Sequence, residues 1–178
     1  MNTYKIPFFG LKRQYKNLQE ELLDVIKNNS KPFWERELKG YSNFHLTISG
    51  KRYTGDRTDA IKNIPKDLMF YEDKLVDRLT SWNNQLKYVF CVSPHGNGYD
   101  CHRTWETLCL GSIPIVKAPM FHELFEGLPI LNVNEWTDVT EELLKNTLAS
   151  FKRRHEQHGF NYDKLKLCFW VDNIKNKV

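Results

Sequence analysis

Residues 88–116 read YVFCVSPHGNGYDCHRTWETLCLGSIPIV, and this stretch decides the fold. The segments Lys87–Ser93 and Ile113–Lys117 are near-continuous apolar runs, a pattern typical of strands that are buried in a parallel sheet. Between them, Cys101–Leu110 has the spacing of a helix, which Gly111 stops. A strand, a helix and a second strand joined by short connections predict a βαβ unit.

The flanking segments extend this alternation of strands and helices. Further strands are expected at Leu128–Asn134 and, more briefly, at Phe44–Ile48, with the Lys/Arg-rich segment after the latter as a loop. Helices are expected at Asn17–Asn29, Tyr71–Leu86, Pro119–Glu126, Thr140–Gly159 and Asp163–Lys177. The sequence therefore predicts an α/β fold, with a Rossmann-like parallel sheet flanked by helices. Residues 1–40 are expected to form a helical N-terminal segment and residues 41–178 the Rossmann-like domain.

The amino-acid composition limits the classes of protein to which this chain can belong. With 178 residues, of which 40% are hydrophobic and 27% charged, the chain has the length of one ordinary globular domain. Its net charge of +4 suits an anionic ligand but is too small to indicate a nucleic-acid partner. The four cysteines are too sparse for a disulfide scaffold. Since no apolar run approaches the roughly 20 residues of a membrane span and no signal peptide is evident, a soluble, cytoplasmic protein is expected.

The loop between the two strands has the chemistry of an anion site. Gly96 and Gly98 allow the backbone to approach a ligand closely, because they have no Cβ. The helix that follows presents unpaired N–H groups and the positive end of its dipole, which favour phosphate. Asp100 is a plausible N-cap, and Arg103 lies in the first turn, where its guanidinium can bind the same anion in a bidentate manner.

Glu106 lies one turn beyond Arg103 on the same face of the predicted helix. A carboxylate at this depth is too far back to touch the phosphate, which it would repel, but it can accept hydrogen bonds from sugar hydroxyls. The stretch contains neither GxxxxGK[ST] nor GxGxxG, so neither a P-loop nor a dinucleotide fingerprint is present. The pattern favours a cradle for a nucleoside diphosphate.

Residues 90–116 also resemble the donor-binding core of exostosin-like glycosyltransferases. The shared features are an apolar strand, a Pro-x-Gly loop, an Arg three residues before an acidic residue, a small-residue turn and an Ile-Pro-Val-like strand. The resemblance covers residues 87–136, and residues 41–57 extend it to a first strand and a basic loop. It implies the C-terminal half of a GT-B fold, in which nucleotide-sugar donors bind.

The resemblance implies a metal-independent glycosyltransferase that transfers a sugar from a nucleotide-diphosphate donor, a UDP-sugar, to a glycan or protein acceptor. No cofactor other than this substrate is implied, and the absence of an Asp-x-Asp pair fits a reaction without metal. His95 and Arg103 are the catalytic candidates, and Arg52 or Arg57 is expected to reach the phosphates. The implied donor-binding residues are Gly96, Asn97, Gly98, His102, Arg103, Glu106 and Arg57.

Alternative interpretations stay open at this point. Arg103 and Glu106 could form a solvated ion pair one helical turn apart. His95 could be a base, a phosphate ligand or a surface histidine, and His102 could bind phosphate or face solvent. A zinc site that uses Cys91 and these histidines matches no common spacing.

A complete GT-B enzyme has two Rossmann-like domains, whereas this chain has room for one. The alternative function is therefore a non-catalytic nucleotide-sugar or glycan-binding remnant, or a half-enzyme that a partner chain completes. A basic RNA-associated domain is a third reading, which the modest charge disfavours.

Overall fold

The structure, a computed structural model, describes residues 20–26, 31–44, 54–96, 101–117 and 122–175. The chain divides into two compact units, Met1–Ser30 and Lys31–Val178. In the first unit residues 20–26 are helical, inside the helix expected there. The second unit holds the sheet and all the residues discussed below.

Five parallel strands form one sheet in the order β2-β1-β3-β4-β5. The strands are β1 (Glu37–Ser42), β2 (Met69–Tyr71), β3 (Tyr88–Val92), β4 (Ile113–Val116) and β5 (Leu131–Asn132). The predicted fold class, an α/β fold with a Rossmann-like parallel sheet flanked by helices, is confirmed. The boundary expected between residues 40 and 41 falls inside β1.

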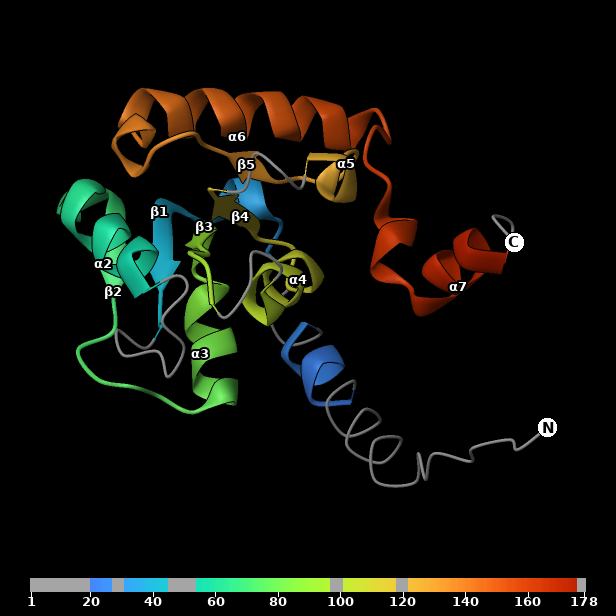
Figure 1. The fold of residues 1–178 in the computed structure, drawn as a ribbon, viewed down its shortest axis with the longest axis horizontal. Coiled ribbons are helices and arrows are strands. Elements are labelled where there is room, and N and C mark those ends of the chain that lie inside the picture. Colours follow the sequence, from blue (N-terminus) through green and yellow to red (C-terminus); the bar gives the residue numbers. More distant parts are fainter. Residues whose placement is uncertain (1–19, 27–30, 45–53, 97–100, 118–121, 176–178) are drawn as a thin grey trace. The chain divides into compact units, whose positions relative to one another are not determined.

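Helices cover both faces of the sheet, with α6 on one side and α3 and α4 on the other (Figure 1). The α-helices are α2 (Thr54–Asn63), α3 (Arg78–Gln85), α4 (His102–Cys109), α5 (His122–Phe125), α6 (Glu141–Glu156) and α7 (Leu167–Lys175). The short 3₁₀ helices are η1 (Phe33–Glu35), η2 (Lys66–Leu68), η4 (Trp136–Asp138) and η5 (Tyr162–Leu165). Alternating strands and helices of this kind bury both faces of a parallel sheet.

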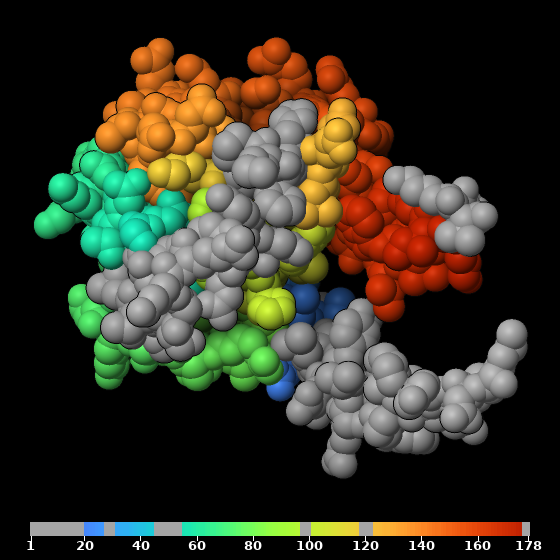
Figure 2. Space-filling view, viewed as in Figure 1, coloured from blue at the N-terminus to red at the C-terminus, as the bar shows by residue number. Residues whose placement is uncertain are grey.

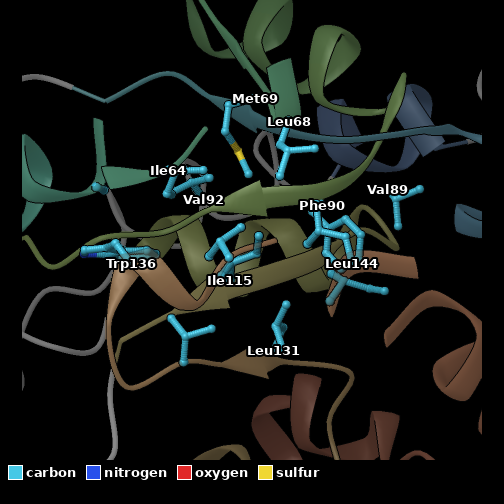
Figure 3. Close-up of a cluster of buried hydrophobic side chains, with 14 of the residues drawn as sticks. Ile64, Leu68, Met69, Val89, Phe90, Val92, Ile115, Leu131, Trp136 and Leu144 are labelled. Carbon is cyan, nitrogen blue, oxygen red and sulfur yellow. The ribbon is translucent and has the colours of Figure 1, made fainter. Parts of the chain in front are cut away.

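The larger core lies where α2 and α6 cover the sheet. Every residue of β3 and β4 is buried. Five of them belong to one core cluster with Ile64, Trp136 and Leu144, as Figure 3 shows in part: Val89, Phe90, Val92, Ile113 and Ile115. Figure 2 shows the surface of α2 (teal) beside the segment that leads into α6 (orange), in agreement with the contact between α2 and η4. These contacts fix the carboxyl ends of β1 and β3, where the candidate site lies.

Two elements of the first half differ from their predictions. The first strand occupies Glu37–Ser42 rather than Phe44–Ile48, and Phe44 follows it outside any strand. The segment ELKGYS is mostly polar and was therefore not predicted as a strand, although its last three residues are buried. At Gly40 the end of the Met69 side chain occupies the space that a Cβ would need, so a larger residue at this position would force that side chain to move. The basic segment expected as a loop, which ends at Arg57, overlaps the start of α2. This helix was not predicted because few of its residues are apolar.

The helix predicted at Tyr71–Leu86 is also shorter than expected. Tyr71 ends β2, and α3 begins only at Arg78, after Asp77 caps it by accepting a hydrogen bond from the Thr80 N–H. The spacing of Leu75, Leu79 and Trp82 predicts one apolar face for this helix, but only Trp82 is buried and the two leucines are exposed, so that prediction is wrong. The charged residues before Asp77 are not part of the helix, because Asp77 is the N-cap after which the helix begins.

The βαβ prediction for residues 87–117 is confirmed. β3 and β4 pair in parallel, and Gly111 ends the helix between them with a positive φ of 68°. A residue with a Cβ would be strained in that left-handed conformation. The α4 helix begins at His102, one residue later than expected.

Candidate functional site

The candidate site lies at the carboxyl end of the sheet, where β1 and β3 are neighbours. From β1 the chain leaves toward β2 on one side, and from β3 it leaves toward β4 on the other. Ligands of doubly wound sheets bind at such a switch point, because the two outgoing connections diverge there. The segments at this point are residues 43–44 after β1 and residues 93–96 after β3.

The turn after β3 is held against the start of α4. Ser93 Oγ lies 2.9 Å from Thr104 Oγ1, and the Gly96 N–H donates to Cys101 Sγ at 3.0 Å. The Cys101 thiol donates in turn to the carbonyl of Pro94 at 3.6 Å. A Cβ at position 96 would lie 3.3 Å from the sulfur, so glycine suits this close approach. The turn therefore has a defined place beside the first turn of α4.

The first turn of α4 is oriented toward the same point. Within the described residues, the N-cap Cys101 makes no side-chain capping bond. Amide groups at such a helix start and the positive end of the dipole favour an anion. The expected anion site would therefore consist of this helix N-terminus together with the basic side chains around it.

Two arginines from different elements meet beside this helix start. The guanidinium carbons of Arg57, from α2, and Arg103, from α4, lie 6.0 and 5.3 Å from the ring centroid of Phe44. Arg57 Nε donates to the His95 carbonyl at 3.1 Å, which fixes it to the turn after β3. Burial, and next the positive charge of Arg103, lower the pKa of Arg57. An anion between the two guanidinium groups would relieve their repulsion.

Glu106 and Arg103 line one cavity of about 200 Å³ between α3 and α4. The Trp82 indole N–H donates to Glu106 Oε2 at 3.3 Å, which orients the carboxylate. The cavity wall consists of Tyr41, Asn43, Ser81, Trp82, Gln85, Cys91, His102, Arg103 and Glu106. The carboxylate therefore faces a hollow beside Arg103, as a group that binds sugar hydroxyls must.

The alternative of an Arg103–Glu106 ion pair is wrong. No salt bridge joins these two side chains, both of which are described, and each has a different neighbour. Arg103 stacks on Phe44, and Glu106 accepts from Trp82. Their charges therefore remain available to a ligand rather than to each other.

His95 is buried, with 6% of its surface exposed, so the interpretation as a surface histidine is wrong. Its backbone N–H donates to Asp56 Oδ2 at 2.8 Å, and its Nδ1 lies 3.4 Å from the same oxygen. Burial lowers the pKa of His95, while the charge of Asp56 opposes that shift. At neutral pH the imidazole is therefore uncharged.

Asp56 joins three elements at the site. Its Oδ1 accepts from the Trp136 indole N–H at 2.7 Å, and Lys117 Nζ lies 3.8 Å from the same oxygen. Lys117 also lies 3.0 Å from Glu135 and 3.3 Å from Asp59. Trp136 is fully buried, so it packs in the core and has no exposed face on which a ligand could stack. This network holds α2, the turn after β3 and η4 together.

The structure thus brings together Arg57, His95, Gly96, Arg103 and Glu106. His102 is exposed at the cavity mouth, so its solvent-facing alternative is consistent with the structure. Asn97, Gly98, Arg52 and Asp100, which the sequence also singled out, lie outside the described residues.

The cysteine alternatives find no support in the described residues. Burial raises the pKa of the Cys91 thiol to about 11, so it is protonated and a poor nucleophile. In the part of the chain that the structure describes, no group of three or more His, Cys, Asp or Glu side chains could hold a metal ion.

Sequence reasoning missed Phe44, Asp56, Trp82 and Gln85 at this site. Asp56 accepts a hydrogen bond from the indole of Trp136, which lies 80 positions away in the sequence. No local sequence pattern predicts such a pair. Trp82 and Gln85 share a face of α3, because they are three positions apart. The predicted helix at Tyr71–Leu86 already contained both positions, so their spacing placed Gln85 beside Trp82, but spacing alone does not indicate that the glutamine is buried.

Comparison with known protein families finds no family model that matches this chain, and comparison with curated proteins finds no match either. Among the helices in the described residues, none has the length and apolar character to cross a membrane. The function of this chain must therefore be inferred from the geometry of the site.

Proposed function

We propose that this chain binds a nucleotide-diphosphate sugar and acts as a glycosyltransferase, with a UDP-sugar as donor and a glycan or protein as acceptor. The observation that carries the proposal is the position of Arg103. Its guanidinium meets Arg57 on Phe44, and its side chain also lines the cavity that contains Glu106. Arg103 therefore lies next to both the proposed phosphate site and the proposed sugar site.

The diphosphate belongs at the start of α4, between Arg57 and Arg103. Negative charge develops on the leaving diphosphate as the bond to the transferred sugar breaks. Two guanidinium groups that are already in place stabilise this charge without reorganisation. Bidentate contacts of arginine with phosphate oxygens also fix the orientation of the donor. This chemistry requires no metal ion to neutralise the leaving group.

The ribose of the donor belongs in the cavity beside Glu106. A carboxylate accepts hydrogen bonds, and the indole N–H of Trp82 holds one oxygen of Glu106 in place. Since Glu106 lies one helical turn behind Arg103, the sugar that it binds is adjacent to the diphosphate.

His95 has a positioning role in this proposal. Its ring is buried beside Asp56, and its carbonyl accepts from Arg57 Nε. His95 therefore affects sugar transfer indirectly, because it positions Arg57 and the turn after β3.

The test is isothermal titration calorimetry with UDP and GDP on the wild-type chain and on Glu106→Ala. Loss of a hydrogen bond to a charged group predicts a decrease in UDP affinity of roughly 10- to 100-fold. Glu156→Ala, which removes an exposed carboxylate at the end of α6, is the matched control and should bind like wild type. Equal affinity of wild type and Glu106→Ala would remove Glu106 from the site.

A second candidate function, nucleotide-sugar binding without transfer, is favoured by one observation. The ring of His95, the candidate base, is buried and held by Asp56. The chain could then serve as a binding protein or as half of an enzyme that a partner chain completes. Release of UDP from a UDP-sugar by the isolated chain, in the presence of acceptor glycans, separates transfer from binding alone.

A further inference from the structure

The cavity beside Glu106 contains a buried polar group that the proposed function does not yet use. Gln85, the last residue of α3, is 3% exposed, and its Nε2 has no hydrogen-bond partner in the described part of the chain. Burying an amide N–H without an acceptor destabilises a protein, so such groups are rare. A ligand that accepts this hydrogen bond explains why the group is there.

The neighbours of Gln85 define what that ligand must offer. Trp82, one turn earlier on the same face of α3, donates to Glu106 Oε2, and Gln85 and Glu106 line the same cavity. The wall thus presents an amide donor and a carboxylate acceptor close to one tryptophan. A hydroxyl group accepts and donates at once, whereas a carbonyl oxygen only accepts and cannot satisfy Glu106.

The size of the cavity limits which part of a ligand enters it. About 200 Å³ is smaller than the roughly 300 Å³ at which pockets for whole ligands begin. One ring therefore enters, and the charged part of the ligand stays outside, near Arg57 and Arg103. A ribose with two neighbouring hydroxyls meets these requirements.

We propose that Gln85 is a binding residue for the ribose of the donor, and that the pair Gln85–Glu106 selects ribonucleotides by their 2′,3′-diol. The Gln85 amide donates to one hydroxyl oxygen, and the hydroxyls of the diol donate to Glu106. The inference depends on the proposed function, because it names the sugar that the same site recognises.

The test is titration calorimetry with UDP, 2′,3′-dideoxyuridine diphosphate and pyrophosphate on wild type and Gln85→Met. Methionine keeps the volume of glutamine and removes the donor. Wild type should bind UDP at least about tenfold more tightly than the dideoxy nucleotide. Gln85→Met should lose about 3- to 10-fold in UDP affinity and bind pyrophosphate and the dideoxy nucleotide unchanged. Gln157→Met, at the exposed end of α6, is the matched control and should bind all three like wild type.

Thermal unfolding of the ligand-free proteins distinguishes binding from a structural role. Because the amide N–H has no partner without ligand, Gln85→Met should unfold at the same temperature as wild type or higher. A lower unfolding temperature, or an equal loss of UDP and pyrophosphate affinity, would show that Gln85 supports the fold and would overturn the inference. UDP binding that Gln85→Met leaves unchanged would overturn it too, while the proposed function stands. Wild type that binds neither UDP nor GDP would refute both.

Discussion

The backbone N–H of His95 donates a hydrogen bond of 2.8 Å to Asp56 Oδ2, across 39 positions of sequence. The same carboxylate accepts from the Trp136 indole at 2.7 Å. One acidic side chain thereby fixes the turn after β3 to α2 and to η4. Since Arg57 follows Asp56 and donates to the His95 carbonyl, the geometry of the anion site depends on this contact.

Asp56→Ala should lower the free energy of unfolding by about 2–4 kcal/mol, because it leaves two donors without their acceptor. Urea denaturation followed by tryptophan fluorescence measures this change. Asp163→Ala, which removes an exposed carboxylate paired with Lys166, should change the stability by less than about 0.5 kcal/mol. A loss no larger for Asp56→Ala than for Asp163→Ala would show that the carboxylate does not organise the site.

Stability should fall as the pH drops below about 6.5, the ordinary pKa of histidine. Burial lowers the pKa of His95 in the folded state, so the unfolded state binds the proton more readily. The stabilisation is complete above that pH and decreases toward the lower, folded pKa, by at most about 1.4 kcal/mol per pH unit. His95→Gln should flatten the dependence between pH 7 and 5.5 in urea titrations. The same slope in wild type and variant would contradict a buried, neutral His95.

Arg103→Gln should weaken UDP binding by roughly 10- to 100-fold and pyrophosphate binding to a similar extent, because it removes a charged contact to phosphate. The ligand-free variant should be as stable as wild type, since the repulsion between Arg103 and Arg57 is lost. Arg153→Gln, at an exposed position of α6, is the control in calorimetry. Selective loss of UDP binding with normal pyrophosphate binding would place Arg103 at the sugar alone.

Gly40→Ala should lower stability by about 1–3 kcal/mol, because the new Cβ meets the Met69 side chain and lies 3.3 Å from Val92 Cγ2. In the double variant with Met69→Ala, the two losses should be less than additive, by about 0.5–3 kcal/mol. Chemical denaturation of the four proteins of this cycle measures the coupling. Additive losses would mean that Met69 is not the obstacle at position 40.

The strands that are buried along their whole length could be predicted from the sequence. β3 and β4 are apolar at nearly every position, because both faces of a parallel sheet are covered, and Gly111 marks the end of the helix between them. The placement of Arg103 and Glu106 on the same helix face follows from the helical period. These local signals were enough to select the helix start and the carboxylate that form the candidate site.

The missing elements lack such local signals. β1 contains Glu37, Lys39 and Gly40, and only its position beside β2 and β3 brings Gly40 close to the side chains of Met69 and Val92. The partners that sequence reasoning missed come from distant segments, as with Asp56 of α2 and Phe44 after β1. Contacts of this kind follow from the order of the strands, which periodicity in a single sequence does not reveal.

A crystal structure of the chain with UDP bound is the decisive test of the proposed donor site. We expect the diphosphate at the start of α4 between Arg57 and Arg103, and the ribose in the cavity with its hydroxyls on Glu106. UDP bound elsewhere, or a diphosphate in place with the ribose turned away from Glu106, would contradict it.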